Sequence, residues 1–126
     1  YFRTEATDAN DDATGDSALF PASSLMGMQP TSDTALTLYF KPMVRRDPTG
    51  SADSANSLDN HDSVVVTIPA NTHIIAMRAI SEIINKKESS AFVVIANDDS
   101  GGTEYLSGSG ITACDTITVA AAYANS

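Results

Sequence analysis

The sequence predicts an all-β fold, a β-sandwich or jelly-roll-like domain with an extended N-terminal arm. Short runs rich in β-branched residues recur between residues 35 and 123, and such runs are typical of strands. Polar segments containing Gly, Asn, Asp and Ser separate these runs and indicate turns. The first 34 residues are mostly small and polar. Several short strands joined by turns favour a sandwich-like domain.

The length of 126 residues fits one domain. We therefore expect residues 1–34 to form the arm and residues 35–126 to form a single β-sandwich domain. A chain of this size can bury roughly two-thirds of its unfolded surface, so a core is possible without disulfides. Cys114 is the only cysteine, and its apolar neighbours predict a buried, unreactive thiol.

The predicted arm begins at Tyr1, so either an initiator Met precedes it or the mature chain begins after processing. Its acidic residues are spaced among small polar ones, a composition that does not bury enough apolar area to offset the entropy of ordering. We predict that a partner chain holds the arm, and that deleting residues 1–30 leaves the β-domain folded. The predicted partner-binding residues of the arm are Phe2, Leu19, Phe20, Leu25 and Met26.

The first strand of the β-domain is predicted at residues 35–44. Leu36, Leu38 and Phe40 alternate with other positions, and we expect these three side chains to face the core. Pro42 has no N–H to donate to a neighbouring strand. This strand is therefore expected to lie at an edge of its sheet or to end there.

A long polar loop is predicted at residues 45–62. Loops of this length are uncommon in small domains and are often interaction segments. Arg45 and Arg46 open the loop and either anchor it or contact an acidic neighbouring subunit. We include both arginines among the predicted partner-binding residues.

Residues 63–68 are strongly β-branched and predict a strand, which Pro69 ends. The next segment, residues 72–85, has two interpretations. As a helix it places apolar residues such as Met77 and Ile80 on one face. Its β-branched content and the short links on both sides favour a strand, whereas a helix would change the fold class to α+β.

The C-terminal part of the chain predicts two further strands. Residues 91–96 form an apolar run, and residues 115–123 open with the alternation of a strand. Between them, residues 107–110 read Ser-Gly-Ser-Gly, which predicts a flexible connection.

The charge of the chain disfavours two classes of partner. Seven basic and sixteen acidic residues give a formal net charge of −9. A negative surface repels phosphate backbones and anionic lipid headgroups, so we expect neither nucleic-acid nor membrane partners. No run of eighteen apolar residues is present either, so no membrane-spanning segment is predicted.

The candidate catalytic residues do not form a recognisable pattern. The two histidines are His61, in the polar loop, and His73, beside an apolar run. A hydrolytic triad needs a nucleophile with supporting sequence context, and neither Gly-x-Ser-x-Gly nor Ser-x-x-Lys occurs with such context. We expect His73 to cover the start of a strand, and we predict that the chain is not an enzyme.

Two acidic segments could bind calcium weakly through their oxygen atoms. They are residues 59–62 and residues 97–99, the latter followed by Glu104. The EF-hand spacing is absent, which favours solvated acidic turns, and we predict no metal and no cofactor.

Residues 63–111 resemble small head and decoration-type structural proteins of tailed bacteriophages. The matching pieces are a strand ending in Ile68-Pro69-Ala70, a long strand from Ile74 to Ile84, a second strand from Phe92 to Ile95, and a polar turn with an aromatic residue from Asn97 to Tyr105. The resemblance implies a β-sandwich that binds capsid proteins, often as an oligomer around a symmetry axis. Residues 1–34 and 45–62 have no counterpart in it.

These observations together predict a virion structural protein located on the capsid surface. We expect a decoration or cement protein that binds and stabilises neighbouring capsid subunits. Its partners would be the major capsid protein or other virion subunits, and further copies of itself in a homo-oligomer. The alternative is a free surface-binding module, calcium-dependent or carbohydrate-recognising, that uses Asp59, Asp62, Asp98 and Asp99.

Overall fold

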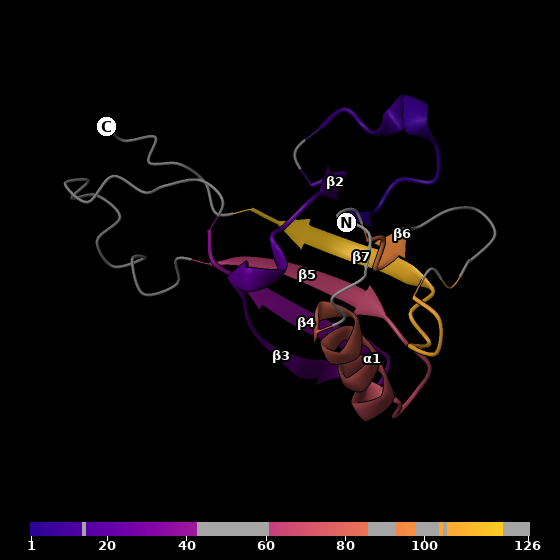
Figure 1. Cartoon of the computed structure of the whole chain (residues 1–126). Helices are drawn as coiled ribbons and strands as arrows, with labels where there is room; N and C mark the ends of the chain where they lie inside the picture. Colours follow the sequence, from indigo (N-terminus) through magenta and orange to yellow (C-terminus); the bar gives the residue numbers. More distant parts are fainter. Residues whose placement is uncertain (14, 43–60, 86–92, 98–103, 105, 120–126) are drawn as a thin grey trace.

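The structure is a computed structural model of the chain. It describes residues 1–13, 15–42, 61–85, 93–97, 104 and 106–119. Within these residues the fold is mostly β, with two sheets and one helix (Figure 1). This architecture fits a β-rich or α+β fold. None of the helices in the described part of the chain is long and apolar enough to cross a membrane.

The larger sheet has four strands in the order β3-β4-β5-β7, and all neighbouring strands are antiparallel. The strands are β3 (Leu25–Ser32), β4 (Ala35–Phe40), β5 (Asp62–Thr67) and β7 (Ala113–Thr118). Because side chains alternate across a strand, β4 and β5 bury every second apolar residue on one face of this sheet, and β7 adds Cys114 and Ile117.

The smaller sheet has three short strands in the order β2-β1-β6. They are β1 (Phe2–Arg3), β2 (Ser17–Ala18) and β6 (Ala96–Asn97), and two 3-10 turns, η1 (Asp8–Asn10) and η2 (Ala22–Ser24), accompany them. Strand β1 is antiparallel to β2 and parallel to β6. This sheet therefore joins the first residues of the chain to a segment more than ninety positions later.

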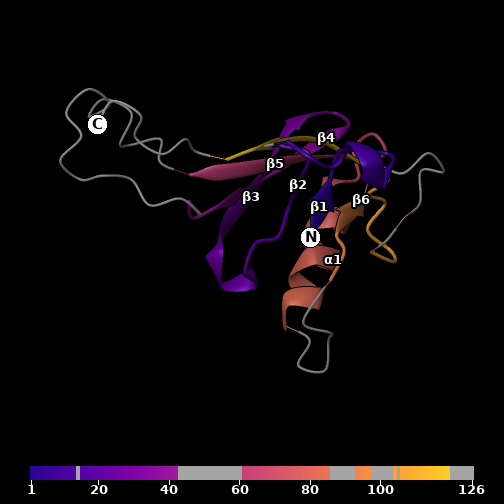
Figure 2. The same ribbon diagram turned by 90° about the horizontal axis from the view of Figure 1, so that it is seen from above.

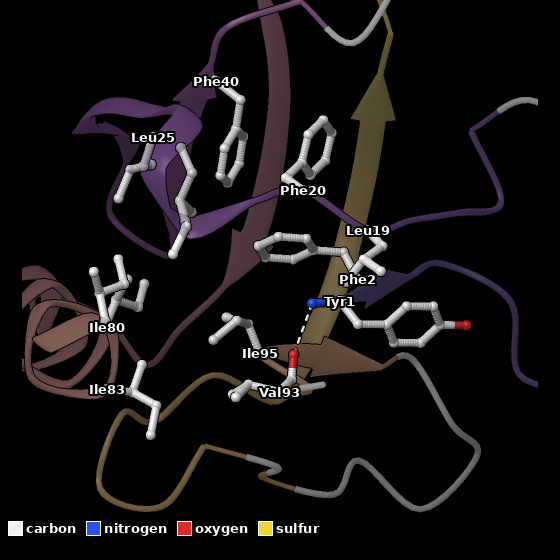
Figure 3. A pocket seen from close by; sticks show the side chains of 13 residues that line it. Tyr1, Phe2, Leu19, Phe20, Leu25, Phe40, Ile80, Ile83, Val93 and Ile95 are labelled. Atoms are coloured by element: carbon white, nitrogen blue, oxygen red, sulfur yellow. Dashed lines mark hydrogen bonds between the residues drawn. The ribbon is translucent and has the colours of Figure 1, made fainter. Parts of the chain in front are cut away.

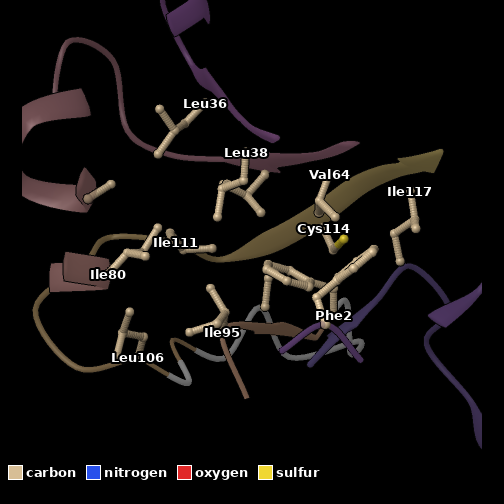
Figure 4. Packing of buried hydrophobic residues seen from close by; sticks show 14 of the residues in the cluster. Phe2, Leu36, Leu38, Val64, Ile80, Ile95, Leu106, Ile111, Cys114 and Ile117 are labelled. Atoms are coloured by element: carbon tan, nitrogen blue, oxygen red, sulfur yellow. The ribbon is translucent and has the colours of Figure 1, made fainter. Parts of the chain in front are cut away.

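The core lies between the large sheet and the elements on one side of it. Helix α1 (His73–Asn85) and the small sheet lie on the same side of the large sheet (Figure 2). The buried apolar side chains come from both sheets and the helix (Figure 4). The inward residues of β4 are Leu36, Leu38 and Phe40, as predicted, and β4 ends at Phe40, before Pro42.

The predicted strand at residues 72–85 is wrong, because this segment is helix α1. Asn71 has a positive φ of 62° and redirects the chain, and the Thr72 carbonyl accepts hydrogen bonds from Ile75 N and Ala76 N. Helical spacing buries Ala76 and Ile80 on the inner face of the large sheet. The β-branched residues of this segment are a weaker constraint than the need to cover that face. The long strand implied by the bacteriophage resemblance is therefore not formed here.

The expectation that residues 1–34 stay apart from the core is also wrong. Phe2 and Phe20 are only 2% and 8% exposed. The Phe20 ring stacks on that of Phe40, with centroids 4.2 Å apart, and Phe2 meets both rings edge-on. Few apolar side chains are needed to order this segment, because they enter a core that the rest of the chain provides.

The Ser-Gly-Ser-Gly segment predicted to be flexible is an ordered turn. Ser109 is fully buried, and its hydroxyl donates to Leu106 O at 2.7 Å and accepts from Ile111 N at 3.1 Å. Gly108 and Gly110 have positive φ values of 82° and 78°, which glycine adopts without strain. The turn leads directly into the core at Ile111.

The remaining strand predictions have mixed outcomes. The strand predicted at residues 63–68 is β5, which begins one residue earlier, and the final strand, β7, also begins two residues earlier than predicted. Of the strand predicted at residues 91–96, the described part contains only Ala96 in a strand. Most of the predicted loop at 45–62 lies outside the described residues. Cys114 is buried, as predicted.

Truncation of Phe2 should destabilise the whole fold. Phe2→Ala removes a buried ring from the aromatic cluster, and we expect a loss of about 3–5 kcal/mol of unfolding free energy. Leu19→Ala, at a side chain that is 58% exposed, is the matched control and should change the value by less than about 0.5 kcal/mol. Chemical denaturation measures both. If deletion of residues 1–30 leaves a cooperatively folded domain, the core described here is incorrect.

The two glycines of the ordered turn should respond differently to alanine. At Gly108 a Cβ atom would meet nothing within 4 Å, so Gly108→Ala adds only backbone strain, about 1 kcal/mol. At Gly110 the Cβ would lie 3.1 Å from Pro69 Cδ, so Gly110→Ala should lose about 2–3 kcal/mol. Thermal unfolding measures the unfolding free energy that each variant loses. If Gly108→Ala and Gly110→Ala lose the same amount, this turn does not pack on Pro69.

Candidate functional site: an apolar pocket beside helix α1

An apolar pocket lies between the N-terminal segment, the large sheet and helix α1. Its cavity volume is about 160 Å³. Side chains from all three parts point into a common space (Figure 3). Within the described part of the chain, the lining residues are Tyr1, Phe2, Leu19, Phe20, Ala22, Leu25, Leu38, Phe40, Ile80, Ile83, Ile84, Val93 and Ile95.

The floor of the pocket is rigid and the rim is exposed. The floor is the aromatic cluster of Phe2, Phe20 and Phe40, whose ring contacts hold each side chain in place. At the rim, Leu19 is 58% exposed and Ile84 is 38% exposed. Apolar side chains with this exposure at the mouth of a preformed pocket are a characteristic of binding surfaces.

Local structure explains why these residues meet. Strand β2 ends at Ala18, and the extended chain that follows turns Phe20 inward and leaves Leu19 outside. On the helix, Ile80, Ile83 and Ile84 have the three- and four-residue spacing of one helical face. The pocket forms where this face meets the N-terminal segment.

The main polar groups at the pocket belong to Tyr1. Its amino nitrogen donates to Val93 O at 2.7 Å, which closes the N-terminal segment onto the chain before β6 (Figure 3). Burial lowers the pKa of this amino group to about 6, and Cys114 opposes this effect electrostatically. The phenol of Tyr1 points away from the cavity, and its hydroxyl lies 3.5 Å from Asp11 Oδ2.

The described side chains that line the pocket are suited to non-covalent binding of an apolar group. Apart from the Tyr1 phenol, every lining side chain in the described part of the chain is a hydrocarbon. Such a lining offers dispersion contacts and the removal of apolar surface from water. The pocket therefore suits an apolar group of another molecule.

Four of the predicted partner-binding residues meet at this pocket, although the reason differs from the one expected. Phe2 and Phe20 form its floor, Leu25 its wall and Leu19 its rim. Met26, the fifth of the arm, is 54% exposed on β3 and does not line the pocket. Arg45 and Arg46 lie outside the described residues.

Sequence reasoning missed the residues that helix α1 contributes. The strand interpretation that the sequence favours does not bring Ile80, Ile83 and Ile84 together, whereas the helical alternative places them on one face. Their spacing was the available signal, because three isoleucines at i, i+3 and i+4 mark an apolar helical stripe. Val93 and Ile95 carried no signal for the pocket, since only the tertiary structure brings them to Tyr1.

The histidines have structural positions in this fold. His73 Nε2 lies 2.8 Å from Ser32 O and 3.1 Å from Ala35 O. Carbonyl oxygens only accept hydrogen bonds, so Nε2 carries the proton and donates. His73 thus ties the first residue of α1 to the end of β3 and to the start of β4. The His61 ring packs edge-on against Tyr39.

The acidic segments considered for calcium are only partly described. Asp59, Asp98 and Asp99 lie outside the described residues. Asp62 is completely buried at the start of β5, which is unsuited to a surface cation site. In the ranges that the structure covers, no group of three or more His, Cys, Asp or Glu residues could hold a metal ion.

Comparison with known proteins adds no further identification. No family model matches the chain, and no curated protein or solved structure matches it.

The Tyr1 amino group should make the stability of this 126-residue chain depend on pH. Its pKa falls from 8.0 in the unfolded chain to about 6 in the folded one, so the folded state disfavours the protonated amine. Stability should therefore rise as pH rises from 6 to 8, by about 1 kcal/mol after allowance for partial exposure. Urea unfolding across this range measures it. The N-terminally acetylated chain is the control and should lose this increment.

Proposed function

We propose that this chain is a virion structural protein, a decoration or cement protein of the capsid surface that holds neighbouring subunits through its apolar pocket. The observation that supports this proposal is the open pocket with a rigid aromatic floor and exposed Leu19 and Ile84 at its rim. An apolar side chain of a capsid subunit would fill it.

The energetics of such a contact suit an anchor. Burial of one large apolar side chain contributes about 1.5–3 kcal/mol, and the most important residues of interfaces fill preformed pockets of this kind. A cavity near 160 Å³ has room for one ring or one branched side chain. The floor is already ordered by its own aromatic contacts, so little conformational entropy is lost on binding.

The charge of the chain is consistent with this role. A net charge of −9 opposes non-specific association of free copies. The described lining of the pocket carries no charged side chain, so contact at the pocket itself is not opposed by this charge. A partner with an apolar anchor and basic residues around it would be attracted over a distance and then held by the anchor.

The N-terminal segment is already folded in the free chain, so binding does not require an arm that folds on the particle. Phe2 and Phe20 already belong to the core of the free chain, and only rim residues remain for a partner. The two sheets would be the layers of a small β-sandwich, as in the proteins that the sequence resembles. Association of several copies is part of the same proposal.

Substitutions at the rim of the pocket test whether the pocket is the contact with the capsid subunit. Leu19→Asp and Ile84→Asp place a carboxylate at the mouth of the pocket, where burial against an apolar anchor is unfavourable. Ile74→Asp is the matched control, because Ile74 lies on the same helix, is 66% exposed and does not line the pocket. Circular dichroism checks that all three variants remain folded.

The measurement is sucrose-gradient sedimentation with particles from the native source. We expect the unaltered chain and Ile74→Asp to travel with particles of megadalton size, and both rim variants to stay at the top of the gradient. If the native chain itself remains at the top, the virion proposal fails. If the rim variants travel with particles, the pocket is not the contact.

A further inference from the structure

The size and the lining of the pocket beside helix α1 also suit a free apolar molecule. The pocket volume is about 160 Å³. An apolar protein cavity of about 150 Å³ with a lining of Leu, Ile and Phe stays dry and binds benzene. The same three residue types make up most of the described lining here. Because volume and lining chemistry agree, the pocket has room for a ligand of one six-membered ring.

The described lining directs no hydrogen-bonding side chain into the pocket. The phenol of Tyr1 points away from the space, with its hydroxyl 3.5 Å from Asp11 Oδ2 (Figure 3). The Tyr1 amino nitrogen donates to Val93 O at 2.7 Å. A buried water molecule needs about two to four polar partners. Water in this pocket is therefore held weakly, and an apolar ligand that displaces it breaks no hydrogen bond to a described side chain.

Aromatic rings and aliphatic side chains face one another across the pocket. The rings of Phe2, Phe20 and Phe40 lie on one side, and Ile80 and Ile83 of α1 lie on the other (Figure 3). Phe2 meets the two stacked rings at interplanar angles of 62° and 66°. Aromatic rings in such arrangements attract one another beyond the effect of buried area. A further ring in this space adds to the cluster, whereas an aliphatic ligand of the same size gains only dispersion and burial.

We propose that this pocket binds, from solution, a small neutral molecule with one aromatic ring, about the size of benzene. The exposed rim at Leu19 and Ile84 lets such a molecule enter without unfolding of the core. A long acyl chain would leave most of its length in water, and an anionic group finds no opposite charge in the described lining. This inference goes beyond the proposed function, because it rests on the free chain and not on a capsid partner.

NMR of the full chain, labelled at the isoleucine methyl groups, tests the site with benzene as the probe. We expect saturable shifts with a Kd on the order of 1 mM or tighter, as befits a ligand of six carbon atoms. Nuclear Overhauser effects should connect benzene to Ile80 and Ile83. Ile74 and Ile75 lie on the same helix, are 66% and 47% exposed, and do not line the pocket. They are internal controls and should show no such effect.

Two further ligands test the chemical class. Cyclohexane is close to benzene in size but has no π system, so at equal concentration it should bind about 2- to 10-fold more weakly. Benzoate has the same ring and a negative charge. It should not bind, because burial of an unpaired carboxylate in an apolar pocket is unfavourable. The same isoleucine methyl signals report on all three ligands.

A substitution that fills the pocket tests its location independently. Ile83→Phe puts a ring of the chain itself into the space, and benzene affinity should fall by about tenfold or more. Ile75→Phe makes the same change on the same helix at a residue outside the pocket, and should leave the affinity unchanged. Circular dichroism checks the fold of both variants. Leu25→Phe fills the pocket from β3 and replaces Ile83→Phe if that variant does not fold.

The outcomes decide the proposal together. It is supported by saturable benzene binding at the pocket isoleucines that Ile83→Phe abolishes and Ile75→Phe preserves. The absence of saturable binding up to about 10 mM benzene overturns it, as do contacts at the two control isoleucines alone. Cyclohexane binding as tight as that of benzene, or binding of benzoate, overturns the ligand class. None of these measurements uses particles, so this proposal and the proposed function can fail separately.

Discussion

The contact among Phe2, Phe20 and Phe40 is the interaction on which the rest of the structure depends. It joins the first residues of the chain to the end of β4, an inner strand of the large sheet, with the Phe20 and Phe40 rings stacked and their centroids 4.2 Å apart. Because Phe2 is held there, β1 lies beside β6, and Tyr1 N reaches Val93 O. The small sheet, the closure of the core and the floor of the pocket all follow from this single cluster.

The same cluster explains why the pocket is open. Stacked rings are rigid, so they do not collapse into the space between the N-terminal segment and helix α1. The helix fills only part of that space, since Ala76 and Ile80 pack on the sheet while Ile84 remains at the rim. An apolar partner would complete the packing that the described residues leave unfinished.

Strand prediction succeeded where burial on one face imposes a period of two. Leu36, Leu38 and Phe40 had this pattern, and all three are buried. Strand prediction failed at residues 72–85. The isoleucine content of this segment suggested a strand, although the spacing of the isoleucines also fitted a helix. The apolar residues near the N-terminus that line the pocket could be predicted from the sequence as partner-binding residues. Their shared location could not, because nothing in the local sequence relates Phe20 to Ile83 or Val93.

The sequence by itself determined the alternation of the central strands, the buried state of Cys114 and the absence of charge in β3. These are local properties, and side-chain chemistry decides them within a few residues. Only the tertiary structure decided that the polar N-terminal segment belongs to the core and that residues 73–85 form a helix. Both depend on contacts between distant segments. The free energy of burying Phe2 or Ile80 exists only once the large sheet provides a surface to cover.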